Sequence, residues 1–479
     1  MLAKQLLLFA LLPLIQAQET VLGVYIFHRH GDRTSKSWPP TALTDLGYQQ
    51  VYASGNFYRD RYIDGNASSA IFGISSDLVK NSQLNVQAPV DTVLQTSAAG
   101  FLQGLYPPVG AALGSQKLAN GTTVEAPMGG FQLIPVNAVQ STASSANSEN
   151  SAWLQGSSGC NNAIISSNNY FYSQEYIDLL NSTAAFYQSI LPAINTTFTA
   201  AQDNFKNAYS TFDYVHVSEI HNATIPFGDL LTPEVLFQLQ TLADNHEFNL
   251  AYNATDAIRA IAGSTLAAQI VQQLNTTITG KSASQVGIQF GAYAAFLSFF
   301  GLAQLPAVSV NFTGIVDYAS SMTFELVTNA TVSNTSYPSS SDISVRFLFS
   351  NGTASQNPLT AYPLFGQQDT VIPWNTFVTE MNKFSIGDQT SWCNACGNST
   401  GVCVATATST GSPSAQSTVG SSSGGVSKAV AGVIGAMVTL AVILGVEGLI
   451  LLATGLRLVS KKRLASAAAT QGTETGIKS

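Results

Sequence analysis

Residues 25–34 read YIFHRHGDRT, and in this stretch two arginines flank one histidine. The apolar run Val21 to Phe27 predicts a buried strand, and Gly31 predicts its break into a loop. Open α/β sheets bind their ligands at such strand ends. Arginine offers phosphate a planar set of donors, and a neutral imidazole beside it can attack a bound phosphoryl group. An exposed basic turn is the alternative interpretation of the triplet alone.

The stretch resembles the R-H-G-x-R signature of the histidine acid phosphatases, the branch of the histidine phosphatase superfamily that includes acid phosphatases and phytases. The resemblance implies that His30 is the nucleophile and that Arg29 and Arg33 bind phosphate. It also implies an α/β fold, with a phosphoglycerate mutase-like three-layer sheet domain and an inserted helical cap domain. The family's usual proline is replaced by Ser35. Further matches lie between Val21 and Phe384: Thr44-Asp45-Leu46-Gly47, Arg59-Asp60-Arg61-Tyr62, Gly104-Leu105-Tyr106-Pro107-Pro108, Tyr318-Ala319-Ser320, Phe324-Glu325-Leu326 and Val345-Arg346-Phe347.

Two parts of the family's phosphate site are missing. The family has a third arginine before the helix that leads to Gly-Leu-Tyr-Pro-Pro, but residues 86–93 read VQAPVDTV, and no arginine occurs between Arg61 and Arg259. The family also has a His-Asp pair that binds phosphate and protonates the leaving group, expected here near residues 289–290. Residues 282–316 contain no ionisable His, Asp, Glu, Lys or Arg. A lost general acid lowers rates roughly 10²–10⁴-fold, so we expect weak or specialised catalysis.

The sequence alone does not justify a catalytic role for any other residue. Asp32 occupies the variable position of the motif, and His28 precedes His30 by two residues. A surface or capping role is the simpler interpretation of the polar residues in the predicted cap. The residues considered as replacements are Asp32, His28, His216, Glu219, His221, His246 and Tyr293.

The composition restricts the partners. The net charge is −8, and charged residues make up 10% of the chain, against about 25% in typical soluble domains. No basic run occurs outside the C-terminal tail, which argues against a nucleic-acid partner. We expect a phosphorylated small molecule as substrate or ligand, and we expect no cofactor and no metal.

Both ends of the chain carry targeting signals. Residues 1–17 predict a secretory signal peptide, since an apolar core ends at the small residue Ala17. Residues 429–456 are apolar for long enough to span a bilayer, and basic residues follow them. We therefore predict a type I single-pass membrane protein of the secretory pathway, with its ectodomain extracellular or lumenal. Twelve Asn-x-Ser/Thr sequons predict a glycoprotein: Asn66, Asn120, Asn181, Asn195, Asn222, Asn253, Asn275, Asn311, Asn329, Asn334, Asn351 and Asn398.

The four cysteines predict two disulfides, because the secretory pathway is oxidising. They are Cys160, Cys393, Cys396 and Cys403, and three connectivities are open. The Cys-x-x-Cys pair is also compatible with a zinc or redox site, but no second pair and no nearby histidine supports that.

Periodicity and composition predict the domain organisation. We expect four helical windows in and after the cap, at residues 174–194, 198–214, 232–252 and 255–274, and loops over 121–165. We expect helices at 44–62, 89–105, 292–302 and 374–384, and half-buried strands at 322–326 and 343–349. The predicted domains are 1–17 signal peptide; 18–125 and 255–404 α/β domain; 126–254 mainly helical cap; 405–428 Ser/Thr/Gly-rich stalk; 429–456 transmembrane helix; 457–479 cytoplasmic tail.

Three functions compete. The first is a membrane-anchored histidine acid phosphatase that hydrolyses phosphomonoesters through a phosphohistidine. The second is a catalytically impaired pseudophosphatase that binds a phosphorylated ligand. The third is a glycosylated cell-surface interaction protein. The intact His30 loop favours the first two, and the missing arginine and His-Asp pair favour the second over the first.

Overall fold

A computed structural model describes residues 19–139, 159–222, 228–281, 283–333, 335–399 and 403. The predicted signal peptide, stalk, transmembrane helix and tail lie outside these residues. Within them, no helix is both long and apolar enough to cross a membrane.

The described chain contains a mixed eight-stranded sheet and a two-stranded hairpin. The strand order of the large sheet is β10-β8-β7-β1-β6-β2-β5, and β9 pairs with β8. Strands β1, β6, β2 and β5 run parallel to one another, whereas β7 pairs antiparallel with β1, and β8, β9 and β10 are added by antiparallel pairing. The strands are β1 Thr20–Arg29, β2 Leu84–Pro89, β3 Ser115–Lys117, β4 Thr123–Glu125, β5 Asn137–Val139, β6 Val286–Gly291, β7 Ser321–Thr328, β8 Ile343–Ser350, β9 Thr360–Ala361 and β10 Val371–Pro373.

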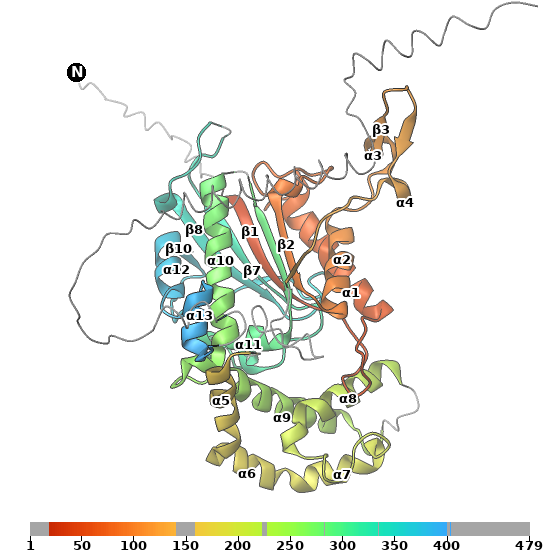
Figure 1. The fold of residues 1–479 in the computed structure, drawn as a ribbon, viewed down its shortest axis with the longest axis vertical. Coiled ribbons are helices and arrows are strands. Elements are labelled where there is room, and N and C mark those ends of the chain that lie inside the picture. The colour runs from red at the N-terminus through yellow and green to blue at the C-terminus, as the bar shows by residue number, and fades with distance from the viewer. Residues whose placement is uncertain are drawn as a thin grey trace, which may run out of the picture. The chain divides into compact units, whose positions relative to one another are not determined.

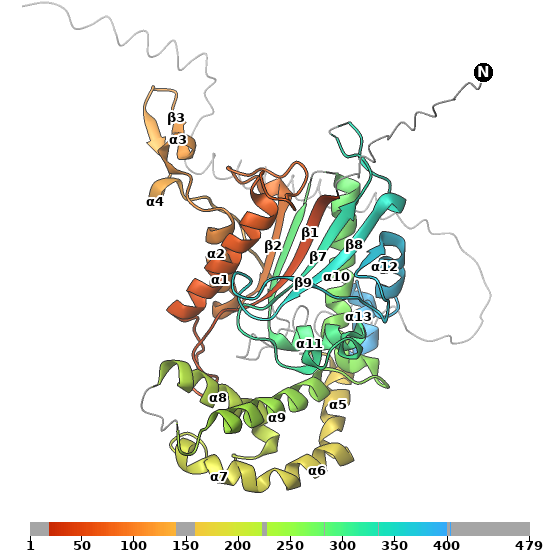
Figure 2. The same cartoon turned by 180° about the vertical axis from the view of Figure 1, so that it is seen from behind.

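Helices cover both faces of the large sheet (Figures 1 and 2). Alternate residues of β1 point to opposite faces, so Ile26 packs in the core with α1 and α2, and Phe27 packs in the core with α10, α11 and α12. The α-helices are α1 Asp45–Tyr58, α2 Thr92–Leu105, α3 Gly110–Gly114, α4 Pro127–Gly130, α5 Asn161–Asn169, α6 Gln174–Ser182, α7 Ala184–Ile194, α8 Ala208–His221, α9 Pro233–Ala251, α10 Ile261–Gly280, α11 Tyr293–Leu302, α12 Trp374–Met381 and α13 Gln389–Cys396.

Helices α5 to α9 form a group beyond one end of the sheet, which we call the cap helices (Figure 1). They have a core of their own, with Tyr187, Ile190 and Leu239 almost fully buried in it. Helix α9 also packs against α11, so the cap lies against the sheet domain. The result is an α/β fold with a mixed sheet and many helices, consistent with the phosphoglycerate mutase-like class.

Two disulfides resolve the connectivity that the sequence left open. Cys160 pairs with Cys396, and Cys393 pairs with Cys403. The first bond joins the residue before α5 to the last residue of α13, across 236 positions of sequence. All four cysteines are buried. The bonds therefore tie the start of the cap to the C-terminal end of the described chain.

Several predicted elements need correction. The helix predicted at 89–105 begins only at Thr92, because Pro89 ends a strand, β2, that the sequence analysis missed. The helix predicted at 198–214 begins at Ala208, and a hairpin, β3–β4, includes part of the predicted loop region.

Two further expectations change with the tertiary context. The helix predicted at 255–274 is α10, which begins only at Ile261 and packs on β1 of the sheet. Strand β7 was expected to be half-buried, but all its residues are buried. Its polar Glu325 is buried because Arg61, Tyr62 and Arg346 donate hydrogen bonds to its carboxylate.

Candidate active site

The loop of the signature begins where β1 ends, at Arg29. It is held by two close neighbours: the backbone N–H of Gly31 donates to Ser97 Oγ on α2, and Thr44 N donates to the Asp32 carbonyl. A Cβ added at Gly31 would lie 2.2 Å from the Gly47 carbonyl oxygen. Only glycine lets the loop approach the first turn of α1 so closely.

His30 is almost fully buried, and its ring has a defined orientation. Its Nδ1 lies 2.8 Å from the Gly31 carbonyl oxygen. A carbonyl can only accept, so Nδ1 carries a proton, and when the ring is neutral its lone pair is therefore on Nε2. The ring centroid lies 5.6 Å from that of Tyr318. This tautomer is the one that a nucleophilic Nε2 requires.

Arg29 lies beside His30 and is also buried. Its Nη1 donates to the Val316 carbonyl, and its guanidinium carbon lies 4.5 Å from the ring centroid of Tyr318 and 5.5 Å from that of Tyr293. The hydrogen bond and the two ring faces fix the guanidinium in place.

Arg33 is fully buried and is bound by the cap. Its Nη2 donates to Asp213 Oδ1 at 2.9 Å and to the Tyr209 hydroxyl at 3.1 Å, both on α8. The other oxygen of Asp213 accepts from Ser35 Oγ and from the Lys36 backbone N–H, each at 2.9 Å. A cap carboxylate therefore holds the anion-binding groups of the loop, a role that the sequence analysis did not assign to Asp213.

A second cap contact reaches the variable residue of the motif. His221 Nε2, from the last residue of α8, lies 2.6 Å from Asp32 Oδ2, to which the Thr44 hydroxyl also donates. Asp32 is fully buried, so its carboxylate joins loop, α1 and cap rather than facing a substrate. His221 thus does reach the loop, although the sequence analysis favoured a surface or capping role for it.

The end of β6 is where the family's missing His-Asp pair was expected. Gln289 and Phe290 are buried inside the strand, beside Phe27 and His28 of β1. The first positions beyond the strand are Ala292 and Tyr293, and they supply neither a carboxyl group nor an imidazole. Within the described residues, no acid therefore stands at this strand end.

Tyr293 connects this strand end to the cap. Its hydroxyl donates to Glu247 Oε2 at 2.6 Å, and His246 Nδ1 lies 2.8 Å from the other oxygen of the same carboxylate. Burial by itself raises the pKa of Glu247, but the hydrogen bonds from His246 and Tyr293 bring it below its ordinary value. Glu247 is therefore ionised at neutral pH and is a poor proton donor there.

Two other histidines pack against aromatic rings: His28 is fully buried, and His216 is half-buried with charged residues nearby. His28 packs against Phe101 and Phe290, and burial lowers its pKa to about 4. His216 stacks between Phe212 and Tyr318, and burial lowers its pKa as well. Both rings therefore stay neutral at neutral pH. The buried ring of His28 does not lie together with His30 on an accessible surface.

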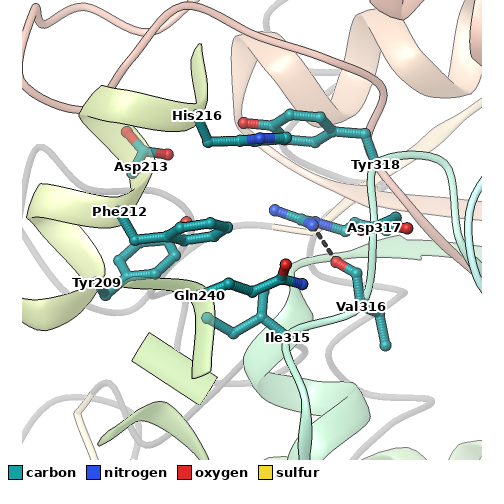
Figure 3. A pocket seen from close by; sticks show the side chains of 10 residues that line it. Tyr209, Phe212, Asp213, His216, Gln240, Ile315, Val316, Asp317 and Tyr318 are labelled. Carbon is teal, nitrogen blue, oxygen red and sulfur yellow. Dashed lines mark hydrogen bonds between the residues drawn. The ribbon is translucent and has the colours of Figure 1, made fainter. Parts of the chain in front are cut away.

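A cavity of about 20 Å³ lies between α8, α9 and the segment around Val316 (Figure 3). It is lined by Arg29 and by Asp213, His216, Gln240 and Tyr318, among others. This volume holds about one water molecule. Of the loop residues Arg29, His30 and Arg33, only Arg29 lines this cavity.

The fold and this loop define a class of protein, and comparison with known families agrees. The chain belongs to the histidine phosphatase superfamily, branch 2, whose family model matches residues 37–350. The match begins just after the His30 loop, so the loop residues themselves are assigned from geometry.

Solved structures of phytases share the fold. The phytase of Klebsiella sp. ASR1 has a TM-score of 0.50 at 11% identity, over 78% of this chain and 98% of its own. The phytase of D. castellii has a TM-score of 0.50 at 12% identity, over 81% and 84%. The Hafnia alvei phytase in complex with tartrate has a TM-score of 0.49 at 16% identity, over 79% and 99%. No curated protein matches the sequence.

Proposed function

We propose that this protein is a membrane-anchored histidine acid phosphatase that hydrolyses phosphomonoesters through a phosphohistidine on His30, with weak or specialised activity. Membership of the histidine phosphatase superfamily supports a phosphomonoester as the substrate class. The observation that carries the proposal is the contact between His30 Nδ1 and the Gly31 carbonyl, because Nδ1 is then the donor and the lone pair of a neutral His30 ring belongs to Nε2, the atom that attacks phosphorus.

The reaction has two steps. Nε2 of His30 forms a bond to phosphorus while the bond from phosphorus to the alcohol oxygen breaks, and Arg29 and Arg33 stabilise the negative charge on the phosphoryl oxygens. Water then attacks the phosphohistidine, which releases inorganic phosphate and restores the neutral imidazole. The alcohol leaves as an alkoxide unless it is protonated. Without an acid at Ala292 or Tyr293, substrates with good leaving groups react best.

A catalytically impaired pseudophosphatase is the second candidate, and one observation favours it. Asp213 already binds Arg33, Ser35 and the Lys36 backbone, so a bound phosphate has to displace a buried carboxylate. Under this alternative, the His30 loop binds a phosphorylated ligand or only stabilises the fold. The glycosylated surface then performs the function of the protein.

We further propose that residues 429–456 anchor the protein as a type I membrane protein, with the described residues on the extracellular or lumenal side. Two disulfides suit an oxidising compartment. Of the twelve sequon asparagines, all but Asn334 lie in the described residues, and none of these is buried. Protease protection of the full-length chain in microsomes, with and without glycosidase, tests this topology.

The catalytic proposal is tested with the full-length chain and its His30→Ala variant. Both are assayed against an aryl phosphate with a good leaving group and against an alkyl phosphate, and covalent phosphate is trapped by an alkaline quench. We expect His30-dependent turnover and labelling with the aryl substrate, and slower turnover of the alkyl substrate. Turnover that survives in His30→Ala, or its absence in the folded wild type, contradicts the proposal. Thermal unfolding confirms that the variant is folded.

A further inference from the structure

A larger groove continues from the cavity beside Arg29. Its volume is about 530 Å³, within the range of small-molecule sites. It shares Gln240, Ile315 and Val316 with that cavity, and Val316 is the residue whose carbonyl binds Arg29. One wall is helix α9 and the other is the segment 310–316. A substrate whose phosphoryl group lies at Arg29 therefore has its alcohol half directed toward this groove.

The walls of the groove are neutral or acidic. Asp244 is the one ionisable residue among those that line it, and its Oδ1 accepts from the Ile315 backbone N–H at 2.8 Å. Two asparagines of the same wall, Asn245 and Asn249, donate through their amide groups to Glu175 at 3.3 Å. No lysine or arginine lines the groove within the described residues.

Arg259 is hydrogen-bonded to helix α9, which forms one wall, but Arg259 does not line the groove. Arg259 donates from Nη1 to the Asn249 carbonyl, and its other nitrogens bind Ser166, so its charge is committed on the buried side. The remaining lining combines amide and hydroxyl groups with apolar side chains, of which Phe237 and Val310 are more than two-thirds exposed.

We propose that this groove binds the alcohol half of the substrate and selects an uncharged alcohol, with hydroxyl groups and an apolar face, over one that carries further phosphate groups. The inference rests on the proposed function. A second phosphate in the groove would meet the carboxylate of Asp244, and no cation among the lining residues would pair with it. Sugar-like hydroxyls can instead bond to the amide of Gln240 and to the hydroxyl oxygens of Thr241 and Thr313.

The charge of the groove also depends on pH. Burial raises the pKa of Asp244 to about 6, and the neighbouring charge of Asp317 adds to this effect. The carboxyl group is therefore ionised at neutral pH and neutral in acid. Discrimination against anionic alcohols is accordingly stronger near pH 7 than near pH 5.

The test compares glucose 6-phosphate with glucose 1,6-bisphosphate, which differ by one phosphate on the same sugar. Every version of the full-length chain also carries Asn311→Gln and Asn351→Gln, because these sequon residues line the groove and glutamine keeps an uncharged amide at both positions. The variants are Gln240→Lys, which adds a cation, and Asp244→Asn, which keeps an acceptor for the Ile315 N–H. The control is Asp178→Lys, on the exposed side of α6.

We expect the wild type to favour the monophosphate about tenfold in kcat/KM near neutral pH, and Gln240→Lys to remove most of that preference. Asp244→Asn should reduce the preference for the monophosphate, and Asp178→Lys should leave that preference unchanged. A wild type that prefers the bisphosphate, or equal shifts for Gln240→Lys and Asp178→Lys, overturns the inference.

Binding separates this inference from the proposed function. If the aryl phosphate is not turned over by the folded wild type, the proposed function fails. If neither sugar phosphate is turned over, calorimetric Kd values for the same two compounds decide the inference by the same ratio. Absence of binding to both compounds in the folded wild type overturns the groove assignment itself.

Discussion

The carboxylate of Asp213, on a cap helix, lies 2.9 Å from Nη2 of Arg33, and neither side chain is more than 2% exposed. The two residues are 180 positions apart in the sequence. A buried guanidinium needs an anion, and in this state the cap supplies it. A carboxylate of the cap therefore pairs with the buried arginine of the loop.

Removing this carboxylate should make the protein depend on phosphate. Asp213→Asn leaves Arg33 buried without its counter-charge, which typically costs roughly 3–5 kcal/mol. Inorganic phosphate can replace the lost charge and stabilises the state to which it binds. We expect a lower Tm without phosphate and a larger rise on adding it than in the wild type. Thermal unfolding across a phosphate series measures both, with Asp178→Asn as the surface control. An equal phosphate response in Asp213→Asn and wild type would contradict the role assigned to Asp213.

The close approach of the loop to α1 should not tolerate a methyl group. In Gly47→Ala the new Cβ would lie 2.0 Å from the Asp32 carbonyl oxygen and 2.7 Å from the Asp32 nitrogen, both backbone atoms. Overpacking of this kind costs roughly 1–3 kcal/mol or more. Gly65→Ala is the matched control, since no atom lies within 4 Å of its added Cβ.

Urea unfolding should show the loss in Gly47→Ala and a change within roughly ±0.5 kcal/mol in Gly65→Ala. The added methyl group should displace the Asp32 backbone, and this displacement should weaken phosphate binding by the Gly47→Ala variant. Similar stabilities for the two variants would show that the loop can move away from α1 at little cost.

A buried acid in the cap should make stability fall as the pH rises. Asp203 is fully buried, and neither carboxylate oxygen has a hydrogen-bond partner in the described part of the chain. Burial raises its pKa to about 7. Between its unfolded pKa near 3.8 and this value, the folded state binds more protons than the unfolded state, so stability decreases with pH across that interval.

Asp203→Asn removes this dependence. The free energy of unfolding of the variant, relative to that of the wild type, should rise by roughly 3 kcal/mol between about pH 4.5 and pH 7.5. Urea unfolding at the two pH values measures the change, and Asp178→Asn, on an exposed site, should show none. A relative stability that does not vary with pH would mean that the carboxyl group finds a partner when it ionises.

The two disulfides should contribute unequally. By the chain-entropy model, the Cys160–Cys396 bond, which closes 236 positions, stabilises by about 5 kcal/mol, and the Cys393–Cys403 bond, which closes 10, by about 3 kcal/mol. We expect Cys160→Ser with Cys396→Ser to lower the unfolding free energy more than Cys393→Ser with Cys403→Ser. Denaturant unfolding of the two double variants measures this difference. Equal losses of unfolding free energy in the two double variants would show that native-state contacts outweigh the entropy of the unfolded chain.

Much of the fold follows from local patterns. The apolar run before His30 is β1, the apolar run before Leu302 is α11, and Thr44 caps α1 through its side chain, all near the predicted positions. Strand β2 was missed although residues 84–88 alternate between apolar and polar, a signal that the nearby Pro89 masked.

Burial in the sheet was harder to predict. Met322, Phe324 and Leu326 alternate with polar residues, which is typical of a half-buried strand. The second face is nevertheless covered, because Tyr58 donates to Ser321, and Arg61 with Tyr62 satisfies Glu325. These partners are more than 260 positions away in the sequence, so no local pattern reveals them.

By itself, the sequence determined the position of the His30 loop, the order of the main elements, the family and the absence of a His-Asp pair from residues 282–316, because each of these follows from residue types at short spacing. The tertiary structure decided the disulfide pairing, the contact of His221 with Asp32 and the ion pair of Asp213 with Arg33. Such contacts depend on where the cap helices pack against the sheet domain. The position of the cap helices is set by the burial of apolar surface across the whole chain, so it cannot be predicted from the local spacing of residues.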